Sequence, residues 1–185
     1  MAARFLTTPT GFFMTPTLHN IHIHVFDTYK SDIPSQKVRT LTRRALAEIL
    51  PQSPTKMSVI IADDETVREL NKYHRGLDKT TDVLSFSFQH QGDYYGDGPK
   101  PSQWTQDTEF VLPPGEAEGI GEIVISYPQT VRQAKAQNKT PYDELAFLLA
   151  HGILHLLGHD HEQAQERTVM EAEQARLLTA MLRIR

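Results

Sequence analysis

The stretch Leu145-Ala-Phe-Leu-Leu-Ala-His-Gly-Ile-Leu-His-Leu-Leu-Gly-His-Asp-His161 combines an almost wholly apolar segment with four of the chain's nine histidines. A helix that is apolar on all sides is buried in a protein core, so this stretch predicts a central helix that ends at Gly158. Burying an imidazole without a partner costs about 1–3 kcal/mol. We therefore expect the histidines of this helix to have partners.

The spacing of the histidines predicts a metal site. His151 and His155 are four residues apart and share one helical face, roughly 5–6 Å apart at Cβ. Gly158 allows a sharp turn, after which His161 can fold back as a third ligand. Three histidines leave one tetrahedral position open for water, as in catalytic rather than structural zinc sites. The sequence therefore predicts one zinc ion per chain, bound by His151, His155 and His161.

Several alternatives to this interpretation remain open. Imidazole ligands also suit copper, iron and nickel. Two helical histidines could instead be hydrogen-bonded core residues, although a third histidine after a helix-ending glycine disfavours that. His159 could replace His161 as a ligand, and Asp160 could orient a ligand histidine or be a turn residue.

Gly152 stands where zinc proteases of the H-E-x-x-H type place the glutamate that acts as general base. The glycine removes that base, which argues against a peptidase. We also expect the small residue to leave room above the metal.

Outward from this stretch, the hydrophobic periodicity predicts an α+β fold. Strands with alternating or β-branched apolar residues are expected at 20–26, 57–62, 83–88 and 122–125. Helices are expected after Pro34, from Asp63 to near Gly76, and over 126–138, 140–157 and 163–182. Helices and strands mix without a strict βαβ rhythm. We therefore expect a single domain over 19–185, with a small mixed four-stranded sheet packed with about five helices.

Two segments lack any periodic pattern. Residues 1–18 are rich in Thr and Pro, carry Arg4 as their single charge, and lack the apolar core of a secretory signal. They predict a flexible N-terminal extension. Residues 89–119 are rich in Pro, Gly, Asp and Gln and predict a long surface loop, which is unusual in a compact domain and often functional.

Bulk composition excludes several classes of protein. The chain has no cysteine, so disulfide scaffolds and thiolate metal sites are excluded. Its longest strongly apolar run, Leu145–Ala150, falls far short of the roughly 20 residues of a membrane span. The net charge of −4 supplies no basic surplus for nucleic-acid binding, so only local basic clusters could provide it.

Three segments resemble the YbeY family of bacterial ribosomal-RNA maturation factors, described as zinc-dependent endoribonucleases. They are the histidine stretch His151–His161, the stretch from Leu70 through Arg75 to Thr-Asp-Val-Leu-Ser-Phe86, and Ile120-Gly-Glu-Ile-Val-Ile-Ser126. Their order and rough spacing match over about residues 20–180. Departures from the family pattern are His159 for an aromatic residue, Glu122 for Asp, Thr80 and Ser87 for prolines, and long segments at 1–18 and 89–119.

The resemblance implies cleavage of single-stranded RNA, chiefly in maturation of the 3′ end of small-subunit (16S) ribosomal RNA, and a role in ribosome quality control. It also implies a cytoplasmic protein that works with ribosomal proteins and assembly factors. No membrane or DNA partner is expected. A non-catalytic assembly factor with a structural zinc, a zinc peptidase and a domain without metal are the rival interpretations.

Arg75 matches the family's arginine, and its planar guanidinium suits a phosphate group. We expect it to stabilise the transition state, with a structural ion pair as the alternative. Asp82 is a possible base or metal-site carboxylate, and equally a cap or turn residue; no general base is identified. Five basic residues could line an RNA path: Lys72, Lys79, Arg132, Lys135 and Lys139. For Arg132, Lys135 and Lys139, an ordinary solvated surface is the preferred interpretation.

Overall fold

The computed structural model describes residues 18–88, 119–159, 161 and 163–183. The expected N-terminal extension and long loop therefore lie outside the described residues, apart from Leu18 and Gly119. No helix in these described ranges is both long and apolar enough to cross a membrane.

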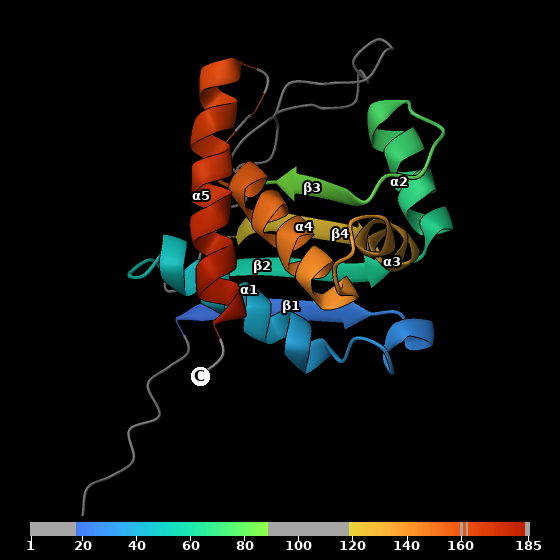
Figure 1. Ribbon diagram of the computed structural model, residues 1–185, viewed down its shortest axis with the longest axis horizontal. Coiled ribbons are helices and arrows are strands. Elements are labelled where there is room, and N and C mark those ends of the chain that lie inside the picture. Colours follow the sequence, from blue (N-terminus) through green and yellow to red (C-terminus); the bar gives the residue numbers. More distant parts are fainter. Residues whose placement is uncertain (1–17, 89–118, 160, 162, 184–185) are drawn as a thin grey trace, which may run out of the picture.

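A four-stranded mixed sheet runs through the centre of the molecule (Figure 1). Its order is β1 (His19–Val25), β2 (Thr55–Ala62), β4 (Gly119–Ser126) and β3 (Val83–Ser87). The first three strands are parallel and β3 is antiparallel to β4. This confirms the expected sheet, although β4 begins at Gly119 rather than at Glu122.

The five expected helices are present, with bounds within a few residues of the prediction: α1 (Ser35–Ile49), α2 (Asp64–Arg75), α3 (Tyr127–Ala136), α4 (Pro141–Leu156) and α5 (Ala164–Leu182). A short 3₁₀ turn, Asp27–Tyr29, follows β1. The helix starts follow the capping signals: Asp63, Ser126 and Thr140 each accept a hydrogen bond from a backbone N–H in the first turn.

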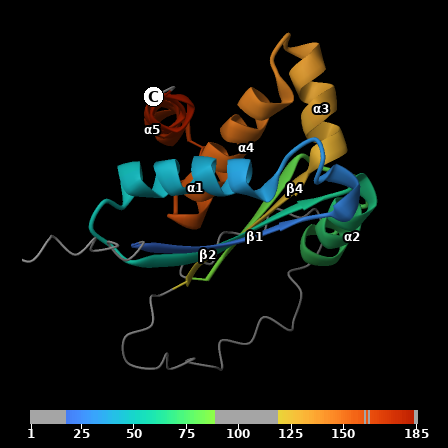
Figure 2. The same ribbon diagram turned by 90° about the horizontal axis from the view of Figure 1, so that it is seen from below.

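Helices cover both faces of the sheet. Alternate strand residues such as Ile61, Ile123 and Ile125 join the main core, to which α1, α4 and α5 contribute. The intervening residues, such as Val124, pack with Val67 of α2 in a smaller core. Figure 2 shows α1, α4 and α5 together on one side. Because α2 packs on the other face, the edge strand β3 lies between α4 and α2.

The central helix α4 is buried as its apolar sequence predicts. Pro141 occupies its first turn, and Thr140 accepts a hydrogen bond from the Asp143 backbone N–H at 3.1 Å. At its other end Gly158 has φ +84°, a left-handed conformation that glycine adopts readily. This turn reverses the chain directly after His155 and directs it toward His161.

Candidate metal centre

The C-terminal half of α4 and the turn after it bring three histidines together. The rings of His151 and His155 lie 4.6 Å apart between centroids, and the ring of His161 lies 5.5 Å and 5.1 Å from them. Each residue offers one ring nitrogen, and the three nitrogens all lie within 4.8 Å of one another. His151 and His155 are half-buried and His161 is exposed, so the group opens to solvent on one side.

This donor set fits a divalent transition metal. The Nε2 atoms of His151 and His155 are 3.1 Å apart. Two nitrogens bonded at about 2.0–2.1 Å to one tetrahedral zinc lie roughly 3.3–3.4 Å apart, so the observed geometry needs little change. The three-histidine group could therefore bind a metal ion.

The environment of His151 favours the neutral imidazole that a metal requires. Burial lowers the pKa of His151, and a hydrogen bond with Gln174 opposes only part of this effect. The Oε1 atom of Gln174, on α5, lies 3.4 Å from Nδ1 of His151. The apolar periodicity of the last helix predicts a buried Gln174, which is confirmed, but it does not predict this contact.

Gly152 serves a different purpose from the one expected. A Cβ atom at this position would lie 2.9 Å from Cδ1 of Ile123 and 3.0 Å from Oγ of Ser85. The glycine therefore lets α4 approach the sheet closely, and the expectation that it leaves room above the metal is wrong. Its space is filled by the strands beneath the helix. The absence of a peptidase base at this position is unaffected.

Two nearby polar residues have other contacts. The backbone N–H of His159 donates to the carbonyl oxygen of Leu154, and His159 does not belong to the three-histidine group found among the described residues. Asp82 accepts hydrogen bonds from the backbone N–H of Val83 and from Nε2 of Gln133. These contacts fit the cap-or-turn alternative for Asp82, since they hold the start of β3 against α3, while the charge of Asp82 also raises the pKa of His151. Asp160 lies outside the described residues.

The last turn of α2, which carries Arg75, contacts the same end of β3 from the opposite face of the sheet. On the α4 side, Oγ of Ser87 donates to the carbonyl oxygen of Leu156, the residue after His155, at 3.1 Å. On the α2 side, the ring of Phe86 lies 4.7 Å from that of His74, the residue before Arg75. β3 therefore lies between α2, which carries Arg75, and α4, which carries His151 and His155. Among the described residues, the Arg75 guanidinium makes no hydrogen bond or ion pair.

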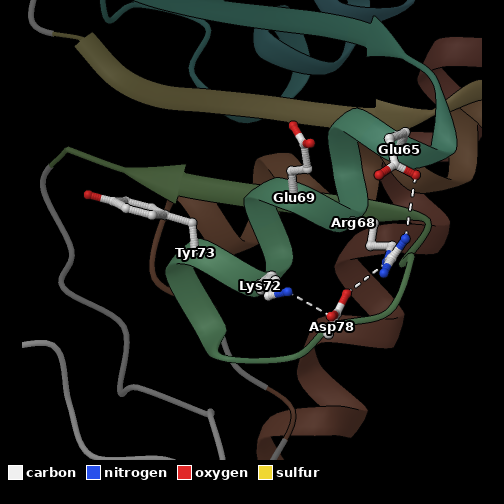
Figure 3. Close-up of a pocket in the computed structure, with 6 residues that line it drawn as sticks. All are labelled: Glu65, Arg68, Glu69, Lys72, Tyr73 and Asp78. Atoms are coloured by element: carbon white, nitrogen blue, oxygen red, sulfur yellow. Dashed lines mark hydrogen bonds and ion pairs between the residues drawn. The ribbon is translucent and has the colours of Figure 1, made fainter.

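A surface groove of about 500 Å³ lies along the outer side of α2, away from the histidines. Figure 3 shows its lining, in which Asp78 pairs with both Arg68 and Lys72. These ion pairs satisfy the groove's cations from within the chain. Among the residues that the structure describes, the one group of three possible metal ligands is the histidine group, and it does not line this groove.

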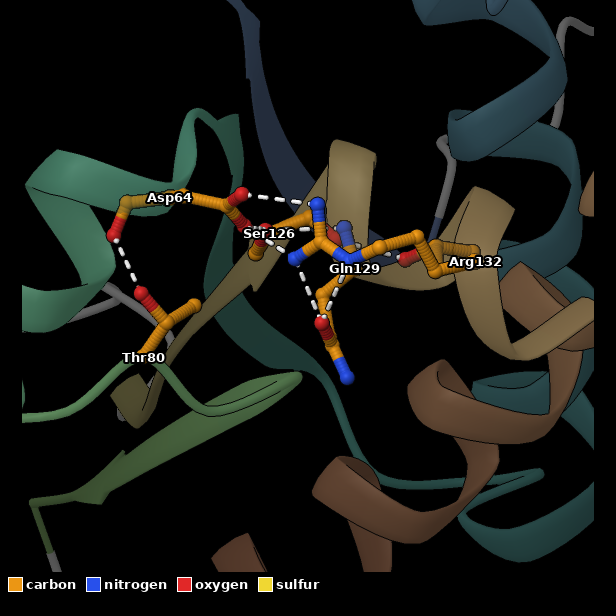
Figure 4. A network of polar contacts seen from close by, with 6 residues as sticks. Asp64, Thr80, Ser126, Gln129 and Arg132 are labelled. Carbon is orange, nitrogen blue, oxygen red and sulfur yellow. Dashed lines mark hydrogen bonds and ion pairs between the residues drawn. The ribbon is translucent and has the colours of Figure 1, made fainter.

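Most of the basic residues considered for an RNA path have acidic partners. Lys72 pairs with Asp78 and Lys139 with Glu144. Arg132 binds Asp64 through two nitrogens, as part of a network with Ser126, Gln129 and Thr80 (Figure 4). For Arg132 and Lys139 this supports the ordinary structural role over an RNA contact.

Comparison with known proteins agrees with the motifs. The family model described as "Endoribonuclease YbeY" matches residues 24–182. A protein named endoribonuclease YbeY from Dehalococcoides mccartyi (strain CBDB1) is 36% identical over 154 residues, covering 83% of this chain and 88% of that protein. Another of that name, from Thermoanaerobacter sp. (strain X514), is 39% identical over 126 residues, covering 68% and 74%.

The fold also has a solved counterpart. The solution structure of the Thermotoga maritima protein TM1509 aligns with a TM-score of 0.52 and 25% sequence identity, covering 87% of this chain and 88% of that one. The family match spans the end of β1, the other three strands, all five helices and the three histidines. On this ground the chain belongs to the endoribonuclease YbeY family.

Proposed function

We propose that this protein is a zinc-dependent endoribonuclease that cuts single-stranded RNA. Membership of the YbeY family supports RNA hydrolysis as the reaction. The observation that carries the metal dependence is the group of three histidine nitrogens within 4.8 Å of one another. A zinc ion held there would supply Lewis-acid chemistry and a nucleophile at neutral pH.

The chain's own residues have defined tasks in this proposal. His151 and His155 hold one zinc ion from the rigid, buried helix α4, and His161 completes the set from the turn. The exposure of His161 leaves the site open to a substrate. Arg75 binds a phosphate oxygen and stabilises negative charge that develops during cleavage.

The biological role we propose is maturation of the 3′ end of small-subunit (16S) ribosomal RNA, with ribosome quality control, in the cytoplasm. Ribosomal and assembly proteins are the expected partners. This role rests on the family resemblance.

The test is cleavage of a labelled single-stranded RNA, with metal content measured on the same samples. Wild type should carry about one zinc and cut the RNA, and His155→Ala should lose both properties. His159→Ala is the matched control, since His159 lies beside the group without belonging to it, and it should keep its metal. Wild type that holds zinc but cuts no RNA would favour an assembly factor with a structural metal.

Arg75→Ala tests the second part of the site. Removing one donor to developing charge lowers kcat by about 100- to 1,000-fold in comparable sites, while the zinc content should not change. An unchanged cleavage rate would exclude this role for Arg75.

A further inference from the structure

Two large side chains stand out on the surface near the end of β3. The exposed fractions of Tyr73 and Phe88 are 75% and 69%, the highest among the large hydrophobic residues that the structure describes. Single exposed apolar residues are ordinary, whereas contiguous exposed apolar groups mark interaction sites. Tyr73 and Phe88 therefore mark an interaction site only if their rings belong to one continuous surface.

Ring contacts link Tyr73 to Phe86, and the chain continues from Phe86 to Phe88. The ring centroids of Tyr73 and His74 are 4.9 Å apart, and those of His74 and Phe86 are 4.7 Å apart. Phe88 lies two residues beyond Phe86, at a bend just past the end of β3, and its N–H donates to the carbonyl oxygen of Ile120 on β4. Its ring lies over Gly119, whose strand partner Lys56 faces away from the main core, so Phe88 and Phe86 lie on the same side of the sheet. Tyr73, His74, Phe86 and Phe88 thus form what we call the aromatic row.

The row is held in place from beneath. Phe86 packs against the smaller core that includes Val67 and Leu84. Phe88 lies against Gly119, where a Cβ atom would be only 3.0 Å from the Phe88 ring. The rings therefore form a supported surface, and a planar ligand that stacks on them would not have to order loose side chains.

The row has a cation beside it, Arg75, as well as the carboxylate of Glu122, the residue that pairs with Phe86. Burial lowers the pKa of His74, which favours its uncharged form at pH 7. Arg75 follows directly, and its guanidinium has no acidic partner among the residues that the structure describes. In Figure 3 the Tyr73 ring points away from the neighbouring Lys72–Asp78 ion pair. Aromatic rings beside a cation are the usual combination for single-stranded nucleic acid.

The row also lies close to the histidine group in the fold. Ser87, between Phe86 and Phe88, bonds to the carbonyl oxygen of Leu156 on the opposite face of β3. One strand width therefore separates the aromatic row from the residue after His155. A single-stranded chain that passes over the tip of β3 could contact both faces.

We propose that the aromatic row stacks the bases of single-stranded RNA next to the cleavage site, while Arg75 holds the adjoining phosphate. This inference rests on the proposed function and names the surface that selects unpaired RNA. Bases in a duplex cannot stack on such a row, because their faces are already covered. Stacking is also tolerant of base identity, so the row selects for strandedness and not for sequence.

The test compares protein variants with and without the exposed rings, each with two RNAs that differ only in whether bases are present. Binding is measured by fluorescence anisotropy in a His155→Ala background, so that no RNA is cut, with an ordinary single-stranded RNA and the same RNA carrying abasic sites. Stacking contributes about 5- to 150-fold per base. Tyr73→Ala with Phe88→Ala should weaken binding of the ordinary RNA at least tenfold and remove the preference over abasic RNA. The conservative pair Tyr73→Phe with Phe88→Trp should restore both.

Val169→Ala is the matched control, because Val169 on α5 is an exposed apolar residue outside the row, and it should bind RNA unchanged. Equal binding of ordinary and abasic RNA by the parent protein would overturn the stacking proposal alone. If neither the wild-type protein nor the His155→Ala variant binds any RNA, the proposed function is overturned as well. Loss of self-association or of a protein partner in the double alanine variant, with RNA binding intact, would make the row a protein interface and overturn the proposal.

Discussion

Gln174 contacts the histidine group from α5, and its two hydrogen bonds determine which of its side-chain atoms faces His151. Its Nε2 donates to the carbonyl oxygen of Phe147 at 3.3 Å, which leaves Oε1 to accept from Nδ1 of His151. A proton held on Nδ1 leaves the lone pair on Nε2, the atom that faces His155. Such partners orient metal-ligating histidines and set their tautomer.

Gln174→Leu should therefore lower zinc affinity by about 10- to 100-fold at pH 7. Gln174→Glu keeps an accepting oxygen and should retain most of the affinity. The measurement is a competition titration against a chromophoric chelator. Gln165→Leu, on an exposed part of the same helix, is the control. A variant that melts earlier but binds zinc as tightly as wild type would show that Gln174 only packs the two helices together.

At the scale of elements, Asp64 connects the start of α2 with β4 and α3. It accepts hydrogen bonds from Oγ of Ser126 at 2.6 Å and from Arg132 at 2.8 and 2.9 Å (Figure 4). The bond from Arg132, with a smaller contribution from Ser126, lowers the pKa of Asp64. Ser126 is fully buried and also caps α3, so this junction fixes where two helices leave the sheet.

The two sides of this junction should differ in their effect on stability. Asp64→Ala leaves the buried Ser126 hydroxyl without its acceptor, which costs about 1–3 kcal/mol. Arg132→Ala removes a largely exposed ion pair, worth under about 1 kcal/mol. Urea denaturation of both variants measures the free energies of unfolding. Equal losses in the two variants would contradict the importance of the buried hydroxyl.

At the scale of the whole molecule, two histidines outside the candidate metal centre couple folding to pH. Burial, with a smaller contribution from Arg43, lowers the pKa of His19 below 6.5, and burial does the same for His74. His19 is buried, and its Nδ1 has no hydrogen-bond partner among the residues that the structure describes. Below pH 6.5 the unfolded chain therefore binds more protons than the folded chain.

Stability should consequently fall as the pH falls from 6.5 through the lowered pKa values, by at most about 1.4 kcal/mol per pH unit for each additional proton bound by the unfolded chain. His19→Val should reduce this slope, because it removes one such group. The measurement is thermal unfolding from pH 8 to pH 5 for both proteins at equal zinc. Parallel curves for the two proteins would exclude a contribution from His19.

The sequence alone was sufficient for most of the elements and for the histidine group. Capping residues such as Asp63, Ser126 and Thr140 act within one helical turn, so their signals can be read locally. The same holds for His151 and His155, because helical geometry places residues four apart on one face. The four strands and five helices confirm this local information, and the family motifs lie on these elements.

Only the tertiary structure decided how distant segments meet. Three contacts join elements distant in sequence: that of Gln174 with His151, that of Gly152 with Ser85 and Ile123, and that of His74 with Phe86. No periodicity encodes them, because they depend on strand order and on which face each helix covers. The sequence predicts the three-histidine group, since its residues share one helix and one turn. The surroundings of that group come from the packing of α5, β3 and α2 around it.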